Sequence, residues 1–282
     1  MNQLKTAMLL ATLSALLLIA GHSLAGGAGF LVGLILSTMV NAEVYWSSDR
    51  SVLKTHRAHA ICEEDAPGLH SIVRELARRG GLPMPKLYLL NDEAPNAFAT
   101  GRNPANGAIV VTEGLLRLLE RDELAGVLAH ELSHIQRGDT LIMTVTATLA
   151  GALSAVARVA RRKSSADGKD DGFISSMLWL LIAPLEAALI QMTISRTREF
   201  LADESGARLT GDPLPLARAL AKIEDAGSGA ALGSARCATA HLFISNPVSR
   251  GRLVRFFQTH PPAAVRIERL EAMTLRTVTE FI

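Results

Sequence analysis

The sequence predicts a mostly helical α+β protein that is anchored in a membrane by about four hydrophobic helices and contains a small β-sheet. Residues 6–42, a run of 37, contain no Asp, Glu, Lys or Arg, which is typical of membrane-spanning segments. Two further apolar stretches, 140–157 and 173–195, follow. Between these segments, residues 86–90 and 108–111 are short apolar runs next to turn-forming residues, which favours strands.

The first apolar run is long enough for two short membrane helices, since one span needs about 20 apolar residues. Glycines around residues 21–29 divide the run, so we expect one helix near Leu4–Ala20 and another near Leu24–Val40. Residues 29–33 form a G-x-x-x-G pattern that lets helices pack closely, although glycine is also simply common in membrane helices. A cleaved signal peptide is the alternative for the first helix.

The two later apolar stretches predict a second membrane hairpin. Thr140–Ala157 holds 18 uncharged residues, and Phe173–Ser195 is interrupted by Pro184 and Glu186. Because an ionisable residue in a membrane segment is costly, Glu186 either faces the helix bundle or lies in a segment that is partly shielded from lipid.

Two hairpins would place both large polar regions on one side of the membrane. Arg50, Lys54 and Arg57 follow the first hairpin, so the positive-inside rule predicts that this side is the cytoplasm of a multi-pass inner-membrane protein. The basic loop 158–172 disagrees with this rule. Either it crosses the membrane despite its charge, or it belongs to a hairpin that only dips into the membrane. The predicted units are an N-terminal transmembrane hairpin 1–42, a domain part 43–140, the second hairpin 141–195 and a helical C-terminal part 196–282.

The polar regions show clear local signals. Residues 63–79 have an apolar stripe at helical spacing that ends at Gly80-Gly81. Residues 96–101 are predicted to be extended, and Thr112 can cap a short helix. A further helix should begin near Asp122.

Composition limits the possible partners. A net charge of +2 and a sequence pI of about 8.7 are too mild to indicate nucleic-acid binding. Cys62 and Cys237 are far apart and form no C-x-x-C pair, so they indicate thiols in a reducing compartment rather than a disulfide framework.

The pattern H-E-x-x-H occupies residues 130–134. Positions four apart lie on one face of a helix, so the imidazoles of His130 and His134 can bind one metal ion. Glu131 points toward the same site, where it can remove a proton from a water molecule, and this combination is typical of zinc hydrolases. The alternatives are a chance match and a structural histidine pair on a core helix.

A catalytic zinc site needs three protein ligands and one open position. His134 should lie about 10 Å along a continuous helix from the second hairpin, which returns the chain to the side it left. Glu199, just after that hairpin, is therefore the best candidate for the third ligand. Asp203 lies one turn further and could accept the second ring proton of a histidine ligand. The alternative for this pair is a solvated charged turn with Arg196 and Arg198.

The chain resembles the HtpX-type membrane zinc metalloproteases over nearly its whole length. The motifs that carry the resemblance are N-A-F-A-T-G at 96–101, H-E-L-S-H at 130–134, S-R-T-R-E-F-L-A-D at 195–203, T-H-P-P at 259–262 and R-I-E-R-L at 266–270. The resemblance implies a zincin-like, gluzincin-type domain that binds one Zn²⁺ per chain through His130, His134 and Glu199. It also implies that Glu131 is the catalytic base.

The resemblance further implies a substrate-binding edge strand and a site for the tetrahedral intermediate. The edge strand would contain Asn96, Ala97 and Phe98 and could pair with an extended substrate. His260 and Arg266 match positions that stabilise the intermediate, and His241 is a competing candidate. The glycine-rich residues 227–233 match no active-site element.

The function expected from these features is a zinc-dependent endopeptidase that acts in stress-related quality control of misfolded or damaged membrane proteins. Its partners would be protein or peptide substrates and the lipid bilayer, with no nucleic acid. A membrane scaffold with a structural zinc is one alternative, but such a site would usually have a fourth protein ligand. A transporter is another, although the sequence shows no inverted repeat of broken helices.

Overall fold

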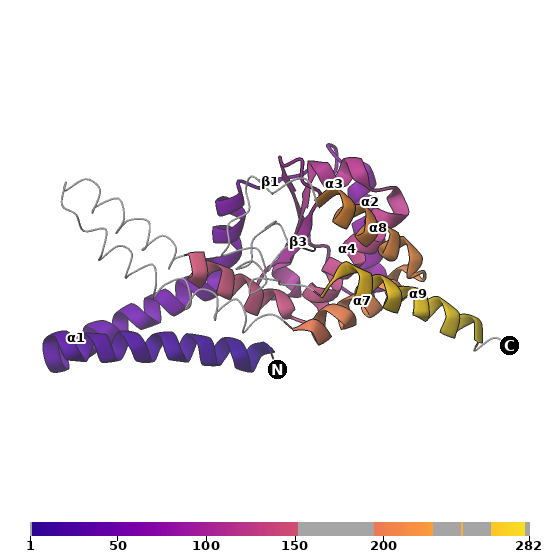
Figure 1. The fold of residues 1–282 in the computed structure, drawn as a ribbon. Helices are drawn as coiled ribbons and strands as arrows, with labels where there is room; N and C mark the ends of the chain where they lie inside the picture. Colours follow the sequence, from indigo (N-terminus) through magenta and orange to yellow (C-terminus); the bar gives the residue numbers. More distant parts are fainter. Residues whose placement is uncertain (1, 152–194, 228–243, 245–260, 280–282) are drawn as a thin grey trace, which may run out of the picture.

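The computed structural model describes residues 2–151, 195–227, 244 and 261–279. Helices predominate in this part of the chain, and one four-stranded sheet lies among them (Figure 1). The predicted α+β class with a small sheet is therefore confirmed. Most of the second predicted hairpin, including the loop 158–172 and Glu186, lies outside the described residues, so the number of membrane helices stays a prediction.

The first apolar run forms α1, Asn2–His56, which folds back on itself at Ala25 and Gly26 (Figure 1). Both residues leave the helical region, and Gly26 has a φ of 57°, which glycine adopts without the usual steric cost. Within α1, Leu4–Ser47 is long and apolar enough to cross a membrane. The break divides this segment into two arms, and it lies within the predicted interval.

The two arms of α1 pack closely through glycines. A Cβ atom at Gly29 would overlap the carbonyl oxygen of Gly21, and one at Gly33 would lie 2.7 Å from a carbonyl oxygen of the first arm. Asn41 Nδ2 also donates to Ser14 Oγ across the arms at 2.7 Å. The G-x-x-x-G pattern therefore acts as a packing motif, one of the two interpretations that the sequence left open.

Replacing Gly29 with alanine is expected to lower the free energy of unfolding by about 1–3 kcal/mol, because the added methyl group forces the arms apart. Gly27→Ala is the matched control, since a Cβ atom at Gly27 meets nothing within 4 Å. Thermal unfolding in detergent measures both variants. Equal midpoints for the two would contradict the close packing of the arms.

The sheet has the strand order β1-β2-β4-β3. β2, Lys86–Leu90, pairs antiparallel with β1, His59–Ala60, and parallel with β4, Ala108–Thr112. β3, Ala97–Thr100, pairs antiparallel with β4 and forms one edge. The strands predicted at 86–90 and 108–111 are confirmed, and the second is one residue longer than expected.

Two helices flank the strands in the sequence. α2, Pro67–Arg79, buries the predicted apolar stripe but begins later than residue 63, because Pro67 favours the first turn, where its missing N–H is not needed. α3, Glu113–Leu118, begins after Thr112, whose hydroxyl accepts a hydrogen bond from the N–H of Leu115. The predicted cap is therefore present.

α4, Arg121–Gln136, carries the H-E-x-x-H motif. Glu123 Oε2 accepts a hydrogen bond from the N–H of Glu120 at 2.9 Å and caps the first turn. The helix ends at Gln136, and a new helical segment, residues 139–151, follows. The prediction of a continuous helix from the motif to the second hairpin was wrong, because Gly138 has a φ of 66° and turns the chain.

The two faces of the sheet are covered by different parts of the chain. Side chains on alternate positions of a strand point to opposite faces. Leu87 and Ile109 belong to the main core with α2 and α4. Phe98 and Val110 belong to a second cluster with the end of α1 and the helical residues 139–151. Met143 and Ala147, at the start of the second predicted membrane hairpin, therefore pack directly on the sheet.

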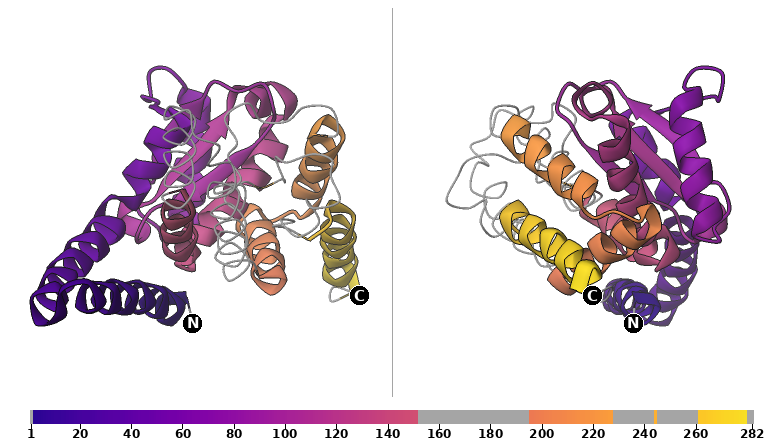
Figure 2. Two further views of the ribbon diagram at one scale, coloured as in Figure 1. Left: turned by 60° about the vertical axis from the view of Figure 1, so that its left-hand side comes forward. Right: turned by 90° about the vertical axis from the view of Figure 1, so that its right-hand side faces the viewer.

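The C-terminal part of the chain forms three described helices: α7, Arg196–Thr210, α8, Leu214–Gly227, and α9, Ala263–Thr279. They group together on one side of the molecule, and the sheet lies on the other side of α4 (Figure 2). α4 contacts β3, α7 and α8. The motif helix is thus the central element between the sheet and the C-terminal helices.

Candidate metal centre

The structure brings together the three predicted metal ligands from two helices. His130 and His134 lie on α4, and Glu199 lies in the first turn of α7. All three are buried. The helices approach closely because Gly206 on α7 has no side chain, and a Cβ atom there would lie 3.0 Å from the backbone nitrogen of His130. This contact places Glu199 opposite the two imidazoles.

The spacing of the ligand atoms suits a tetrahedral ion. The Nε2 atoms of His130 and His134 are 3.1 Å apart. Oxygen atoms of Glu199 lie 3.7 Å from Nε2 of His130 and 3.8 Å from Nε2 of His134. Tetrahedral zinc with bonds of about 2.1 Å separates its ligand atoms by about 3.4 Å. The three residues could therefore hold one metal ion after only small movements.

His130 is held from behind by Asp203 and Arg266. Its Nδ1 lies 2.9 Å from Asp203 Oδ1. Arg266 donates to Asp203 through Nε at 2.8 Å and through Nη2 at 2.6 Å. This paired contact fixes the carboxylate, which in turn directs Nε2 of His130 toward the metal position. The arrangement places Asp203 where the sequence suggested. Arg266 lies beside both partners, since its Nη2 is also 3.4 Å from Nδ1 of His130.

His134 has a corresponding partner that the sequence did not reveal. Its Nδ1 lies 3.0 Å from Asp139 Oδ2, and both side chains are buried. Arg198 Nε lies 3.9 Å from the same oxygen. In the sequence, Asp139 only marked the start of an uncharged stretch. The spacing H-x-x-x-G-D from His134 to Asp139 is the one signal that could have indicated it.

Glu131 lies between the metal ligands and the edge strand. The side chain is buried, and its carboxylate accepts a backbone hydrogen bond from Ala99 on β3. Burial raises the pKa of Glu131 to about 7, and nearby Glu199 adds to this rise, against the opposing effect of His134. A carboxyl group with a pKa near neutrality is suited to accept and return a proton.

The pKa values of the two ligand histidines shift in opposite directions. Burial lowers the pKa of His130 to about 4, and Arg266 contributes to this shift. Burial also opposes the charged form of His134, but Glu199 and Asp139 outweigh it and raise that pKa. For Asp203, burial is outweighed by Arg266, which lowers the pKa to about 2. His130 is therefore neutral at pH 7, as a metal ligand must be.

The strand predicted to bind substrate forms the sheet edge next to Glu131. The outer edge of β3 is the one that faces the site, since Ala99 bonds to Glu131 there. The carbonyl oxygen of Ala97, two residues earlier on the same edge, accepts a hydrogen bond from Ile244 N at 3.0 Å. The side chain of Phe98 is buried in the second core cluster. A partner strand can therefore contact β3 here through its backbone.

Two predicted residues cannot be placed. His260 and its competitor His241 lie outside the part of the chain that the structure describes, as do residues 228–233. Arg266 Nη1 lies 3.3 Å from the carbonyl oxygen of Ile244, so this arginine also contacts the segment that reaches β3.

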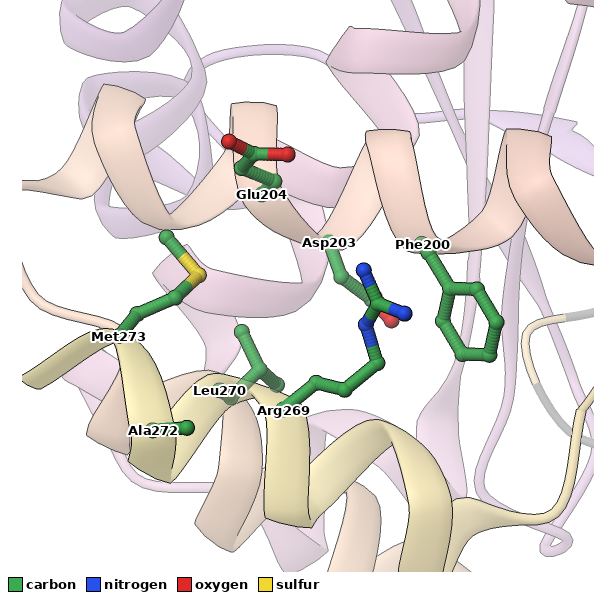
Figure 3. Close-up of a pocket in the computed structure, with 7 residues that line it drawn as sticks. All are labelled: Phe200, Asp203, Glu204, Arg269, Leu270, Ala272 and Met273. Carbon is green, nitrogen blue, oxygen red and sulfur yellow. The ribbon is translucent and has the colours of Figure 1, made fainter.

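A cavity of about 300 Å³ lies between α7 and α9, behind Asp203 (Figure 3). The guanidinium group of Arg269 reaches across from α9 and stacks on the ring of Phe200 at 4.2 Å. None of the three candidate metal ligands lines this cavity. We therefore do not assign it to substrate.

A helical fold with a membrane-type hairpin, an H-E-x-x-H helix and a glutamate from a second helix defines a membrane metallopeptidase. The chain belongs to the peptidase family M48, whose model matches residues 63–274. It is a metalloprotease, and the predicted resemblance to the HtpX type is confirmed.

Curated relatives described as Protease HtpX homolog extend over nearly the full chain. The relative from Pelotomaculum thermopropionicum is 46% identical and aligns with 98% of this chain and 100% of its own length. The one from Desulfatibacillum aliphaticivorans is 49% identical, covering 95% of this chain and 89% of its own. The one from Paraburkholderia phytofirmans is 46% identical, covering 96% and 97%.

A solved structure shares the fold. The crystal structure of S. mikatae Ste24p superposes with a TM-score of 0.51 at 21% sequence identity. The match covers 95% of this chain but 64% of the Ste24p chain. This likeness supports the fold assignment alone.

Proposed function

We propose that this protein is a zinc-dependent membrane endopeptidase that hydrolyses peptide bonds in misfolded or damaged membrane proteins. The observation that supports this is the group formed by His130, His134 and Glu199, whose ligand atoms all lie within 4.8 Å of one another. Among the described residues this group has three members, as a catalytic zinc site requires, rather than the four that usually close a structural site.

The residues around the ligands suit peptide hydrolysis. A zinc ion held there would polarise the scissile carbonyl group and lower the pKa of a bound water molecule. Glu131 would accept the proton of the attacking water and then deliver it to the leaving amine. Arg266 would hold Asp203, and through it His130, in position. Stabilising the oxyanion is then a role that we assign to His260.

We propose that substrates bind as extended chains along the outer edge of β3. Ile244 already donates to the carbonyl oxygen of Ala97, which indicates that this edge accepts a backbone partner. Because Ala99 on this edge bonds to Glu131, a substrate paired with the edge would lie next to Glu131, the proposed base. Of the predicted residues Asn96, Ala97 and Phe98, only Ala97 turns its main-chain groups to this outer edge, as Ala99 also does, because Asn96 bonds to Thr112 on the β4 side and Phe98 alternates with Ala97.

Substrates in or near the bilayer fit the position of the site. Tyr45 and the exposed Trp46 stand at the end of the apolar segment of α1, where aromatic residues favour a membrane interface. Arg102, in the turn after β3, lies 3.4 Å from the carbonyl oxygen of Trp46 through its Nη1 atom. The edge strand is thus close to the expected membrane surface. The basic residues that follow α1's apolar segment support a cytoplasmic location at the inner membrane.

Metal removal tests the proposed function. Treating the purified full-length protein with 1,10-phenanthroline should lower casein cleavage by about 100-fold or more, because the ion contributes several kcal/mol to the reaction. One equivalent of Zn²⁺ per chain should restore cleavage after the chelator is removed. Full activity in protein shown by metal analysis to be zinc-free would overturn the proposal.

A further inference from the structure

We propose that Asp139 is a positioning residue for the metal ligand His134, and that it links the metal centre to the helical segment 139–151, which begins the apolar stretch 140–157. The proposal rests on the proposed zinc site and assigns a role to a residue outside the H-E-x-x-H and S-R-T-R-E-F-L-A-D motifs.

The first argument is the direction of the imidazole. For Nε2 of His134 to face the metal position, Nδ1 must carry the proton and donate it outward. Asp139 Oδ2 lies 3.0 Å from that Nδ1. The Asp139 side chain is 2% exposed, so water cannot readily take over as the acceptor.

The second argument is the parallel with the other ligand. His130 contacts Asp203, which is held by an arginine, and His134 contacts Asp139, which has Arg198 within 3.9 Å. A carboxylate with a cationic neighbour therefore stands behind each imidazole.

The third argument is the backbone that places the carboxylate. Asp139 comes five residues after His134, beyond the one-turn spacing of a helix. Gly138, with a φ of 66°, turns the chain so that the first residue of the next helical segment faces back to His134. A residue with a Cβ atom would be strained at this φ.

The same helical segment also contacts the edge strand. Thr144 Oγ1 lies 2.9 Å from Thr100 Oγ1, and both hydroxyls are buried. Residues 139–151 are therefore bonded at one point to a metal ligand and at another to β3. Movement of this segment would shift the metal site and the proposed substrate edge together.

The test is the zinc affinity of the full-length protein in detergent, measured by competition with a fluorescent chelator. Asp139→Ala should weaken zinc binding about 10–100-fold, the usual effect of losing a partner of a ligand histidine. Asp139→Asn, which keeps an acceptor oxygen, should lose less. Asp65→Ala is the control, because Asp65 is exposed and lies between β1 and α2. The zinc affinity of this variant should match that of the parent protein.

A second readout separates positioning from a merely structural role. In Co²⁺-substituted protein, the visible absorption bands should change in the Asp139 variants and stay unchanged in Asp65→Ala. If Asp139→Ala does not fold, Asp139→Asn decides the question alone. Parental zinc affinity together with parental Co²⁺ bands in the folded variants would overturn the role of Asp139. A parent protein that binds no zinc would instead overturn the proposed function.

Discussion

Replacing Glu131 with glutamine is expected to reduce peptide hydrolysis by about 10²–10⁴-fold, because glutamine cannot accept the proton of the attacking water. Glutamine has nearly the same shape, and its amide oxygen can still accept the backbone hydrogen bond from Ala99. The metal ligands are unchanged, so the variant should keep one zinc per chain. Casein cleavage and metal analysis on the same preparation measure both quantities.

The control for this variant is Glu204→Gln. Glu204 lies on α7 and pairs with Arg208 at the protein surface, away from the metal ligands. The Glu204→Gln variant should cleave casein at the parental rate. If Glu131→Gln retained full cleavage with zinc bound, another group would have to serve as the base. Loss of zinc from this variant would mean that Glu131 supports the metal site itself.

Replacing Glu199 with alanine is expected to remove the metal as well as the activity. Among the residues that the structure describes, Glu199 is the one candidate ligand from outside the motif helix, and two imidazoles alone leave zinc weakly held. The loss of affinity should exceed the roughly 10–100-fold effect of losing an outer partner of a ligand. Zinc content after dialysis, measured by atomic absorption, should fall from one per chain to nearly none.

Glu204→Ala is the matched control for this loss, because it removes a carboxylate from the same helix but outside the site. It should retain one zinc per chain and full cleavage. Stoichiometric zinc in Glu199→Ala, bound as tightly as in the parent, would exclude Glu199 as the third ligand. The search for that ligand would then turn to the residues between 228 and 260.

The membrane-type hairpin and the motif helix could be predicted because their signals are local. Gly26 can adopt a conformation that breaks a helix, and the break in α1 occurs at Ala25 and Gly26. His130 and His134 share a helix face whatever the rest of the chain does. Glu199 and Asp203 are likewise one turn apart on α7. Helical spacing alone therefore indicated that these four side chains form two pairs, each on one face of its helix.

The contacts that support the metal ligands could not be predicted from local sequence. Some of them join segments that are distant in the chain, and one depends on a turn that departs from helical geometry. Arg266 reaches Asp203 over 63 positions in the chain. Ile244 contacts Ala97 through a backbone hydrogen bond, which no pattern of side chains in the sequence indicates. Asp139 is close in sequence to His134, but a positive φ at Gly138 decides that they meet.

Local sequence was sufficient to predict the candidate metal ligands and the proposed base, because the spacing within each helix already groups their side chains by face. The fold alone decided how those helices meet: the close packing of α4 on α7 at Gly206 brings Glu199 to the histidines. It also brought Asp139 behind His134, decided that Asp203 contacts His130 rather than His134, and set the edge of β3 next to Glu131. These are long-range contacts, and they depend on how whole elements pack rather than on any periodicity within one of them.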